Sequence, residues 1–239
     1  MENKPKNYLN DEHLSIGPRE YLRVLNAGGR PVESLPVAEA RKVLADVQAA
    51  VEVDLSGIDE REREIVADGH ALTLHLVRPH GSRGRPPYFV FIHGGGWVLG
   101  DYPTHRRLVR DLVVESEVAA VFVDYTPSPE AKYPQAVDEI YAAVKWVAEN
   151  DAELDLDRRR MALVGNSAGG NMALAAALLA KKRHAPAVRA LVLLWPVTSA
   201  SSDWKSYALY GGERFLTAPL MKWMFDRYTT CLLYTSDAA

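Results

Sequence analysis

Gly165-Asn166-Ser167-Ala168-Gly169 is the stretch that decides the fold of this 239-residue chain. It follows the apolar run Met161–Val164 and precedes a helical pattern over 168–182. A G-x-S-x-G string is common by itself. Between a strand and a helix, however, it predicts a tight turn that presents the serine hydroxyl at a helix N-terminus, where developing negative charge is favoured. We therefore predict Ser167 as a nucleophile. A serine that merely caps the helix is the alternative, although such a cap does not need the Gly170-Asn171 that follows.

Alternating strands and helices surround this turn. The apolar runs are rich in Val and Phe, as is typical of parallel strands buried on both faces. The predicted strands are Tyr88–Ile92, Val118–Val123, Met161–Val164 and Val188–Leu194, and the predicted helices cover 104–115, 135–149 and 168–182. This alternation predicts an α/β fold with a mostly parallel, doubly wound sheet, whose functional groups gather at the C-terminal ends of the strands.

The pattern is different upstream of these strands. Glu64–Ala67 and Ala71–Arg78 alternate apolar and polar residues and meet at Asp68-Gly69, which predicts a hairpin. Residues 15–55 carry two amphipathic helical stretches. We therefore predict an N-terminal helical cap or arm over 1–55, ahead of an α/β core over 56–229.

A second motif, His93-Gly94-Gly95-Gly96-Trp97, directly follows the strand Tyr88–Ile92. Three successive glycines are costly to order unless the backbone must approach something closely. We predict that the N–H groups of Gly94 and Gly95, together with that of Ala168, hold the carbonyl oxygen of a bound ester. A flexible surface loop is the alternative. His93 is interpreted as a residue that fastens the loop, because the base comes last in this chain order. Trp97 forms a wall of the pocket or simply packs in the core.

Composition narrows the remaining function classes. Apolar residues make up 48% of the chain and charged residues 25%, with a formal net charge of −3, so no basic field predicts nucleic acid as a partner. The single cysteine, Cys231, excludes a disulfide framework or a cysteine-based zinc site within one chain. The first twelve residues lack the apolar run of a secretory signal, and no later run is long enough to span a bilayer. We expect a cytoplasmic protein with no membrane partner.

The two motifs and the residues between them resemble one known family. The string His93–Asp101 resembles the oxyanion-loop motif of the hormone-sensitive-lipase family (bacterial family IV esterases), and Gly165–Asn171 is similar to its nucleophile elbow. Three dipeptides resemble the stretch that follows the next strand in that family: Asp124-Tyr125, Pro129-Glu130 and Tyr133-Pro134. The likeness covers about residues 60–229, in the same order and spacing.

This resemblance implies the α/β-hydrolase fold and hydrolysis of short-chain carboxylic esters through an acyl-enzyme, with neither cofactor nor metal. A small-molecule ester is then the partner, and a homodimer is one option for the full-length protein. Residues 1–55 and about 199–229 are expected to form a cap over a pocket that includes Trp97 and Asn166. Many family members have Asp at position 166, and because Asn keeps the shape while removing a charge, we expect tuning rather than loss.

The family's acid and histidine should follow the nucleophile, in that order. After the strand Val188–Leu194 we predict only a helix over 219–228, so the last strands are expected to be missing and the acid and histidine to be absent from this chain. The other candidates have ordinary explanations. His184 supports a basic helix C-terminus, His105 and Asp101 support the loop and a helix start, and solvated charges account for Asp203, Asp226 and Asp237.

The segment Cys231–Ala239 departs abruptly from the family pattern. We expect residues 230–239 to be a non-native tail, and the chain to be an inactive or weakly active esterase fragment. Two alternatives stay open. One is a non-catalytic, receptor-like binder of small molecules, since this family includes hormone receptors that lost the histidine. The other is a peptidase or amidase that shares every visible motif.

Overall fold

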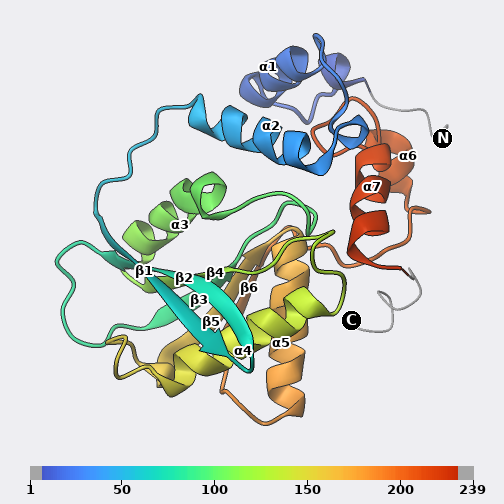
Figure 1. Ribbon diagram of the computed structural model, residues 1–239. Helices are drawn as coiled ribbons and strands as arrows, with labels where there is room; N and C mark the ends of the chain where they lie inside the picture. The colour runs from blue at the N-terminus through green and yellow to red at the C-terminus, as the bar shows by residue number, and fades with distance from the viewer. Residues whose placement is uncertain (1–6, 231–239) are drawn as a thin grey trace.

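In the computed structural model, which describes residues 7–230, six strands form one sheet in the order β1-β2-β4-β3-β5-β6 (Figure 1). Their bounds are β1 Ile58–Ala67, β2 His70–Pro79, β3 Tyr88–Ile92, β4 Ala119–Asp124, β5 Met161–Asn166 and β6 Ala190–Leu194. The pairs β1/β2 and β2/β4 are antiparallel, whereas β4, β3, β5 and β6 run parallel to one another. The mostly parallel sheet predicted from the sequence is therefore confirmed.

Helices cover both faces of this sheet, as a doubly wound fold requires. The core helices are α3 Tyr102–Ser116, α4 Gln135–Glu149 and α5 Ala168–Lys182. One face of the sheet packs against α3, where Val109 and Val113 meet Phe91 and Phe122. The opposite face packs against α4 and α5 in a larger core (Figure 1). Every residue of β3 is buried, which explains its unbroken apolar sequence.

The first two strands form the predicted hairpin. Asp68 and Gly69 both have positive φ, 45° and 87°, which suits a two-residue turn of the primed type. The first strand is longer than predicted, because it begins at Ile58 rather than at Glu64. Its first half is charged, with 59–62 exposed and Arg63 half-buried, yet it pairs along its whole length with β2. Hydrogen bonding to a neighbour forms this half of the strand, and burial of apolar side chains does not.

The N-terminal helices α1 (Ile16–Leu25) and α2 (Val37–Ala49) lie beside α6 (Lys205–Tyr210) and α7 (Ala218–Tyr228), beyond one end of the sheet (Figure 1). The remaining short helical turns are Tyr8–Asn10, Val32–Ser34 and Arg158–Arg160. A buried ion pair of 2.8 Å joins Asp11 to Arg214. Segments from the two ends of the sequence therefore meet above the core.

Arg41 on α2 fastens these helices to the core. Its guanidinium donates to the carbonyl oxygens of Val98 and Ser128 at 2.8 and 3.0 Å and forms a fork with the Glu130 carboxylate. Because Val98 follows the glycine motif directly, this contact ties the N-terminal helices to the predicted oxyanion loop.

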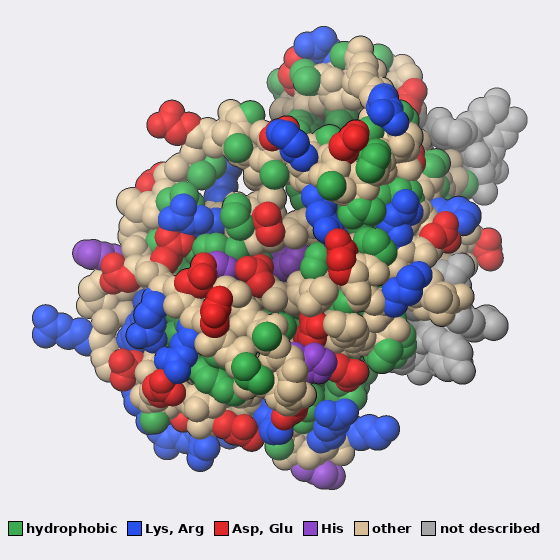
Figure 2. Space-filling model, in the orientation of Figure 1, with side chains coloured by type: hydrophobic (Ala, Val, Ile, Leu, Met, Phe, Trp, Pro, Cys, Tyr) green, Lys and Arg blue, Asp and Glu red, His purple; other side chains and the backbone are tan. Residues whose placement is uncertain are grey.

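The far edge of the sheet is formed by β6. Within residues 7–230 no strand pairs with its outer side, and Val192 is 43% exposed there. The predicted tail, apart from Thr230, lies outside the described residues, and so does Asp237. None of the described helices combines the length and the apolar run needed to cross a bilayer. On the face shown in Figure 2, positive and negative side chains are interspersed rather than gathered by sign.

Candidate active site

Ser167 stands at the turn between β5 and α5. It occupies the N-cap position of α5, but its φ of 53° and ψ of −124° lie outside the extended region of an ordinary N-cap, and its side chain makes no capping hydrogen bond. The alternative of a plain capping serine is therefore wrong. Positive φ is unfavourable for a residue with a side chain, so this turn is strained, as functional sites often are.

Close packing around the turn explains why it is rich in glycine. A side chain at Gly169 would collide with the carbonyl oxygens of Ile92 and His93 at the end of β3. The Ser167 N–H donates to the Leu194 carbonyl of β6 at 2.9 Å, and its own carbonyl accepts the Val197 N–H at 3.2 Å. Ser167 is thus held by the end of β6 and by the segment that follows it.

The glycine loop lies directly against this turn, but its first glycine does not do what we predicted. The Gly94 N–H donates to Asn166 Oδ1 at 2.9 Å, and the Gly94 carbonyl accepts from His93 Nδ1 at 2.7 Å. Both polar backbone groups of Gly94 are therefore satisfied within the protein. The prediction that its N–H faces a bound ester is wrong for this structure, because Asn166 takes that hydrogen bond.

The next two glycines have free N–H groups instead. Gly95 and Gly96 line the same cavity as Ser167, whereas Gly94 does not. In residues 7–230 no hydrogen bond engages the N–H of Gly95, Gly96 or Ala168. Gly95 has a φ of 111°, and a side chain there would collide with the Leu99 carbonyl. Only glycine can hold this loop so close to itself.

His93 lies beneath the loop rather than in the cavity. The residue is 2% exposed and stacks between Phe122 and Tyr125, at centroid distances of 5.4 and 4.3 Å. Burial, with a smaller contribution from the nearby His105, lowers the pKa of His93 to about 3. The imidazole is therefore neutral. Its Nδ1 donates to the Gly94 carbonyl, and this hydrogen bond holds the loop in place.

Asp101 and His105 organise the start of α3. Asp101 is the N-cap in a capping box, accepting the Thr104 N–H at 2.9 Å. His105 Nδ1 lies 3.2 Å from the Asp101 carbonyl, which makes Nδ1 the donor and leaves Nε2 to accept from Asn166 Nδ2 at 3.4 Å. Burial lowers the pKa of His105, in agreement with this neutral form. We predicted His105 only as a support, yet its side chain also lines the cavity beside Ser167.

The cavity that contains Ser167 has a volume of about 440 Å³. Its floor is the turn and the glycine loop, with Trp97 and Asn166 in the wall, and its roof comes from α1, α2 and α7. No Lys, Arg, Asp or Glu side chain lies in its described walls. A second, more open hollow of about 680 Å³ also reaches Ser167 and is lined by Trp195, Thr198 and Tyr207. These surroundings suit a neutral, largely apolar ligand.

No general base contacts Ser167 in the described part of the chain. No hydrogen bond joins the Ser167 hydroxyl to a histidine or a carboxylate within residues 7–230. His184 follows the far end of α5, and Asp226 pairs with Lys222 at 2.7 Å. The same residues hold no cluster of three or more His, Cys, Asp or Glu side chains that could bind a metal ion.

A strained serine between strand and helix, with a glycine loop above it on a mostly parallel sheet, defines an α/β hydrolase. A family model described as the α/β hydrolase fold matches residues 89–237, and the chain belongs to this family.

Several relatives of known activity resemble the chain. The ethyl acetate hydrolase of Pseudomonas putida is 31% identical over 231 residues, which are 91% of this chain and 72% of that protein. Carboxylesterase NlhH of Mycobacterium tuberculosis is 37% identical over 147 residues, 61% of this chain. The present chain spans only 46% of NlhH, and thus about half of that relative's length.

Solved esterase structures share its fold. A thermostable esterase of Pseudomonas putida ECU1011 superposes with a TM-score of 0.92 at 49% identity, covering 95% of this chain and 71% of that one. A hyperthermophilic esterase of the archaeon Pyrobaculum calidifontis gives 0.85 at 32% identity, covering 93% and 72%. Both likenesses cover more than nine tenths of this chain.

Proposed function

We propose that this chain carries the nucleophile and oxyanion-binding part of a hydrolase that cleaves small, neutral carboxylic esters through an acyl-enzyme. The observation that carries the proposal is the positive-φ turn at Ser167, which opens into a cavity lined by Gly95 and Gly96. The uncharged walls of this cavity and the esterase relatives support an ester substrate of low polarity.

In the proposed reaction, Ser167 Oγ attacks the ester carbonyl carbon and its proton passes to a base. Negative charge then develops on the carbonyl oxygen, where the N–H groups of Gly95, Gly96 and Ala168 would stabilise it. Loss of one such donor typically lowers the rate by about 10²–10³. The base returns this proton to the departing alkoxide oxygen as the tetrahedral adduct collapses and the alcohol leaves, and water then cleaves the acyl-enzyme to regenerate the serine and release the acid.

We also propose that the chain alone is at most weakly active. Ser167 without a base remains a neutral alcohol and a poor nucleophile near pH 7. Within residues 7–230 no histidine hydrogen-bonds to its hydroxyl, although His105 lines the same cavity, and the oxyanion donors by themselves give only a residual rate enhancement. An added base of the right size should therefore restore part of the activity.

The same absence of a base in the described residues favours the second candidate, a binder that uses the apolar cavity without turning over its ligand. The two proposals differ in what Ser167 does. Removal of its hydroxyl abolishes hydrolysis in the first case, whereas in the second it leaves retention of an apolar ligand unchanged.

The test measures hydrolysis of p-nitrophenyl acetate and butyrate by the chain and by Ser167→Ala, each with and without millimolar imidazole. We expect imidazole to raise the rate of the unmodified chain above that of Ser167→Ala, which reports the uncatalysed background. With imidazole present, a butyl p-nitrophenyl phosphonate should label Ser167, as detected by peptide mass spectrometry. Equal rates in both proteins and no labelling would overturn the proposal, and the corresponding p-nitroanilide tests for an amidase.

A further inference from the structure

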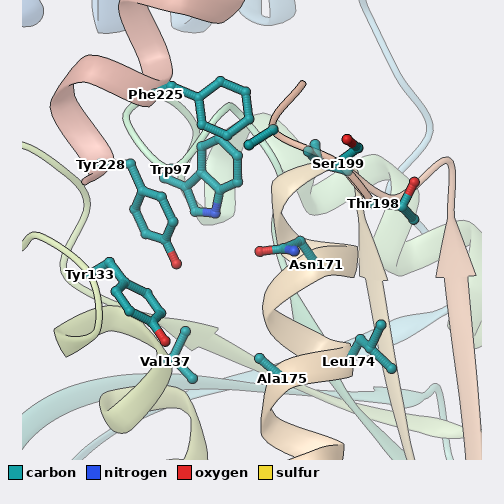
Figure 3. Close-up of a pocket in the computed structure, with 12 residues that line it drawn as sticks. Trp97, Tyr133, Val137, Asn171, Leu174, Ala175, Thr198, Ser199, Phe225 and Tyr228 are labelled. Atoms are coloured by element: carbon teal, nitrogen blue, oxygen red, sulfur yellow. The ribbon is translucent and has the colours of Figure 1, made fainter. Parts of the chain in front are cut away.

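Behind Trp97 lies a small cavity, distinct from the one containing Ser167, although Trp97 and Val197 line both. Its volume is about 40 Å³, and it is lined by α4 and the residue Tyr133 before it, by α5 and α7, by the segment 197–200 and by the loop after β3 (Figure 3). Figure 3 shows the indole nitrogen of Trp97, the side-chain amide of Asn171 and the hydroxyl of Tyr228 turned toward this common space. Elements from three distant parts of the sequence thus direct polar atoms into one cavity.

One of these polar atoms has no partner. Trp97 is 2% exposed, and its Nε1 is fully buried without a hydrogen bond to any described residue. Native proteins almost always satisfy buried N–H groups, with protein atoms or with ordered water. Since the indole N–H can only donate, whatever meets it must be an acceptor.

The walls of the cavity restrict the chemical class of that acceptor. None of the lining side chains is charged, and burial raises the pKa of Tyr228, so its hydroxyl stays neutral. An ion would therefore be poorly compensated here. A cavity of roughly 10–15 Å³ is large enough to hold a water, which also needs two to four polar partners. The observed space meets both conditions and is too small for a substrate.

We propose that an ordered water occupies this cavity. The water accepts from the Trp97 indole N–H, donates one proton to the Asn171 side-chain oxygen and donates the other to the Tyr228 hydroxyl oxygen. Each of the three partners belongs to an element of the candidate active site. Trp97 follows Gly96 in the glycine loop, the Asn171 N–H donates to the Ser167 carbonyl at 3.1 Å, and Tyr228 ends α7. The water therefore links the glycine loop, the nucleophile helix and the cap, and this holds whether or not the chain hydrolyses esters.

The experiment detects this water by NMR on ¹⁵N-labelled protein. The Trp97 indole signal is assigned by its loss in Trp97→Phe. Transfer of magnetisation from water to the indole proton is then measured with water-selective ROESY. We expect a direct cross-peak at Trp97. Trp223 is an internal control, because its indole N–H is also buried and unpaired among the described residues but lines none of these cavities. Its signal should show no such cross-peak.

A variant locates the water at the cavity. Asn171→Leu removes the acceptor and fills the space, so the Trp97 cross-peak should disappear while that of the unmodified protein persists. Should this variant fail to fold, a crystal structure of the unmodified chain at about 1.5 Å decides, with density within 3.2 Å of Trp97 Nε1 as the expected result, the ordinary limit of an N–H···O hydrogen bond. An absent cross-peak in the unmodified protein, or a direct bond from Nε1 to a protein atom, would overturn the inference.

Discussion

Replacement of His93 by Asn should change how the stability of this protein depends on pH. The Asn side-chain amide can keep the donation that His93 Nδ1 makes to the Gly94 carbonyl at 2.7 Å, but it cannot titrate. In the native chain His93 has a pKa of about 3, held low first by burial, against 6.5 when unfolded. The unfolded state therefore binds the extra proton as pH falls below 6.5, which lowers the stability of the folded state.

The size of this effect follows from linkage. Between the unfolded and the folded pKa, each pH unit by which the pH falls lowers the free energy of unfolding by about 1.4 kcal/mol. From pH 7 to pH 5 His93 should thus cost about 2 kcal/mol of unfolding free energy, and the full effect is reached near pH 3. His93→Asn loses the stacking on Phe122 and Tyr125, which lowers stability at both pH values. Only the difference between the two pH values reports the titration.

Urea unfolding followed by tryptophan fluorescence at pH 7 and pH 5 measures that difference. We expect the drop in unfolding free energy to be about 2 kcal/mol smaller in His93→Asn than in the unmodified chain. His80→Asn serves as a matched control, since the His80 ring is exposed and pairs with Asp59 at the surface. Identical drops in the unmodified chain and His93→Asn would refute the reasoning that a neutral, buried imidazole fastens the loop.

Two further tests probe the loop and its attachment. Gly95→Ala should lower the imidazole-assisted, Ser167-dependent hydrolysis by about 100-fold or more, since the added methyl collides with the Leu99 carbonyl. Gly84→Ala is the control, because Gly84 also has a positive φ but has open space around it, and its hydrolysis should not fall in this way. Equal losses in the two variants would contradict the role of Gly95. A double-mutant cycle of Arg41→Met and Glu130→Gln in chemical unfolding should give a coupling energy below about 1 kcal/mol, because the pair is partly exposed. Arg41→Met alone should cost more than this coupling, because it also releases the Val98 and Ser128 carbonyls, and a cost no larger than the coupling would contradict that contribution.

The sequence predicted the parts of the fold that depend on local pattern. Tyr88–Ile92 and the helices 135–149 and 168–182 have the predicted bounds, because unbroken apolar strands and amphipathic helices record their burial in composition. The first half of β1 escaped prediction because its side chains are charged, and only the pairing with β2 makes it a strand. Edge strands that are not buried leave little trace in an apolar pattern.

The site was predictable in its residue types but not in its hydrogen bonds. Two adjacent motifs indicated Ser167 and a glycine loop. Which glycines offer free N–H groups depends on Asn166, a residue far along the chain that reaches back to Gly94. The position of His105 in the cavity wall likewise depends on which side of α3 meets the loop. Such long-range contacts are decided by packing, and spacing along the chain does not encode them.

The Ser167 N–H donates to Leu194 at the end of β6, and its carbonyl accepts from Val197, three residues further on, as well as from Asn171 in α5. Fraying at the end of β6 would therefore also break the hydrogen bond that holds the Ser167 N–H in the turn. Amide hydrogen exchange at residue 167 should follow the opening of β6, the edge strand among residues 7–230, more closely than that of the better buried β3, so the rigidity of the turn depends on that of β6.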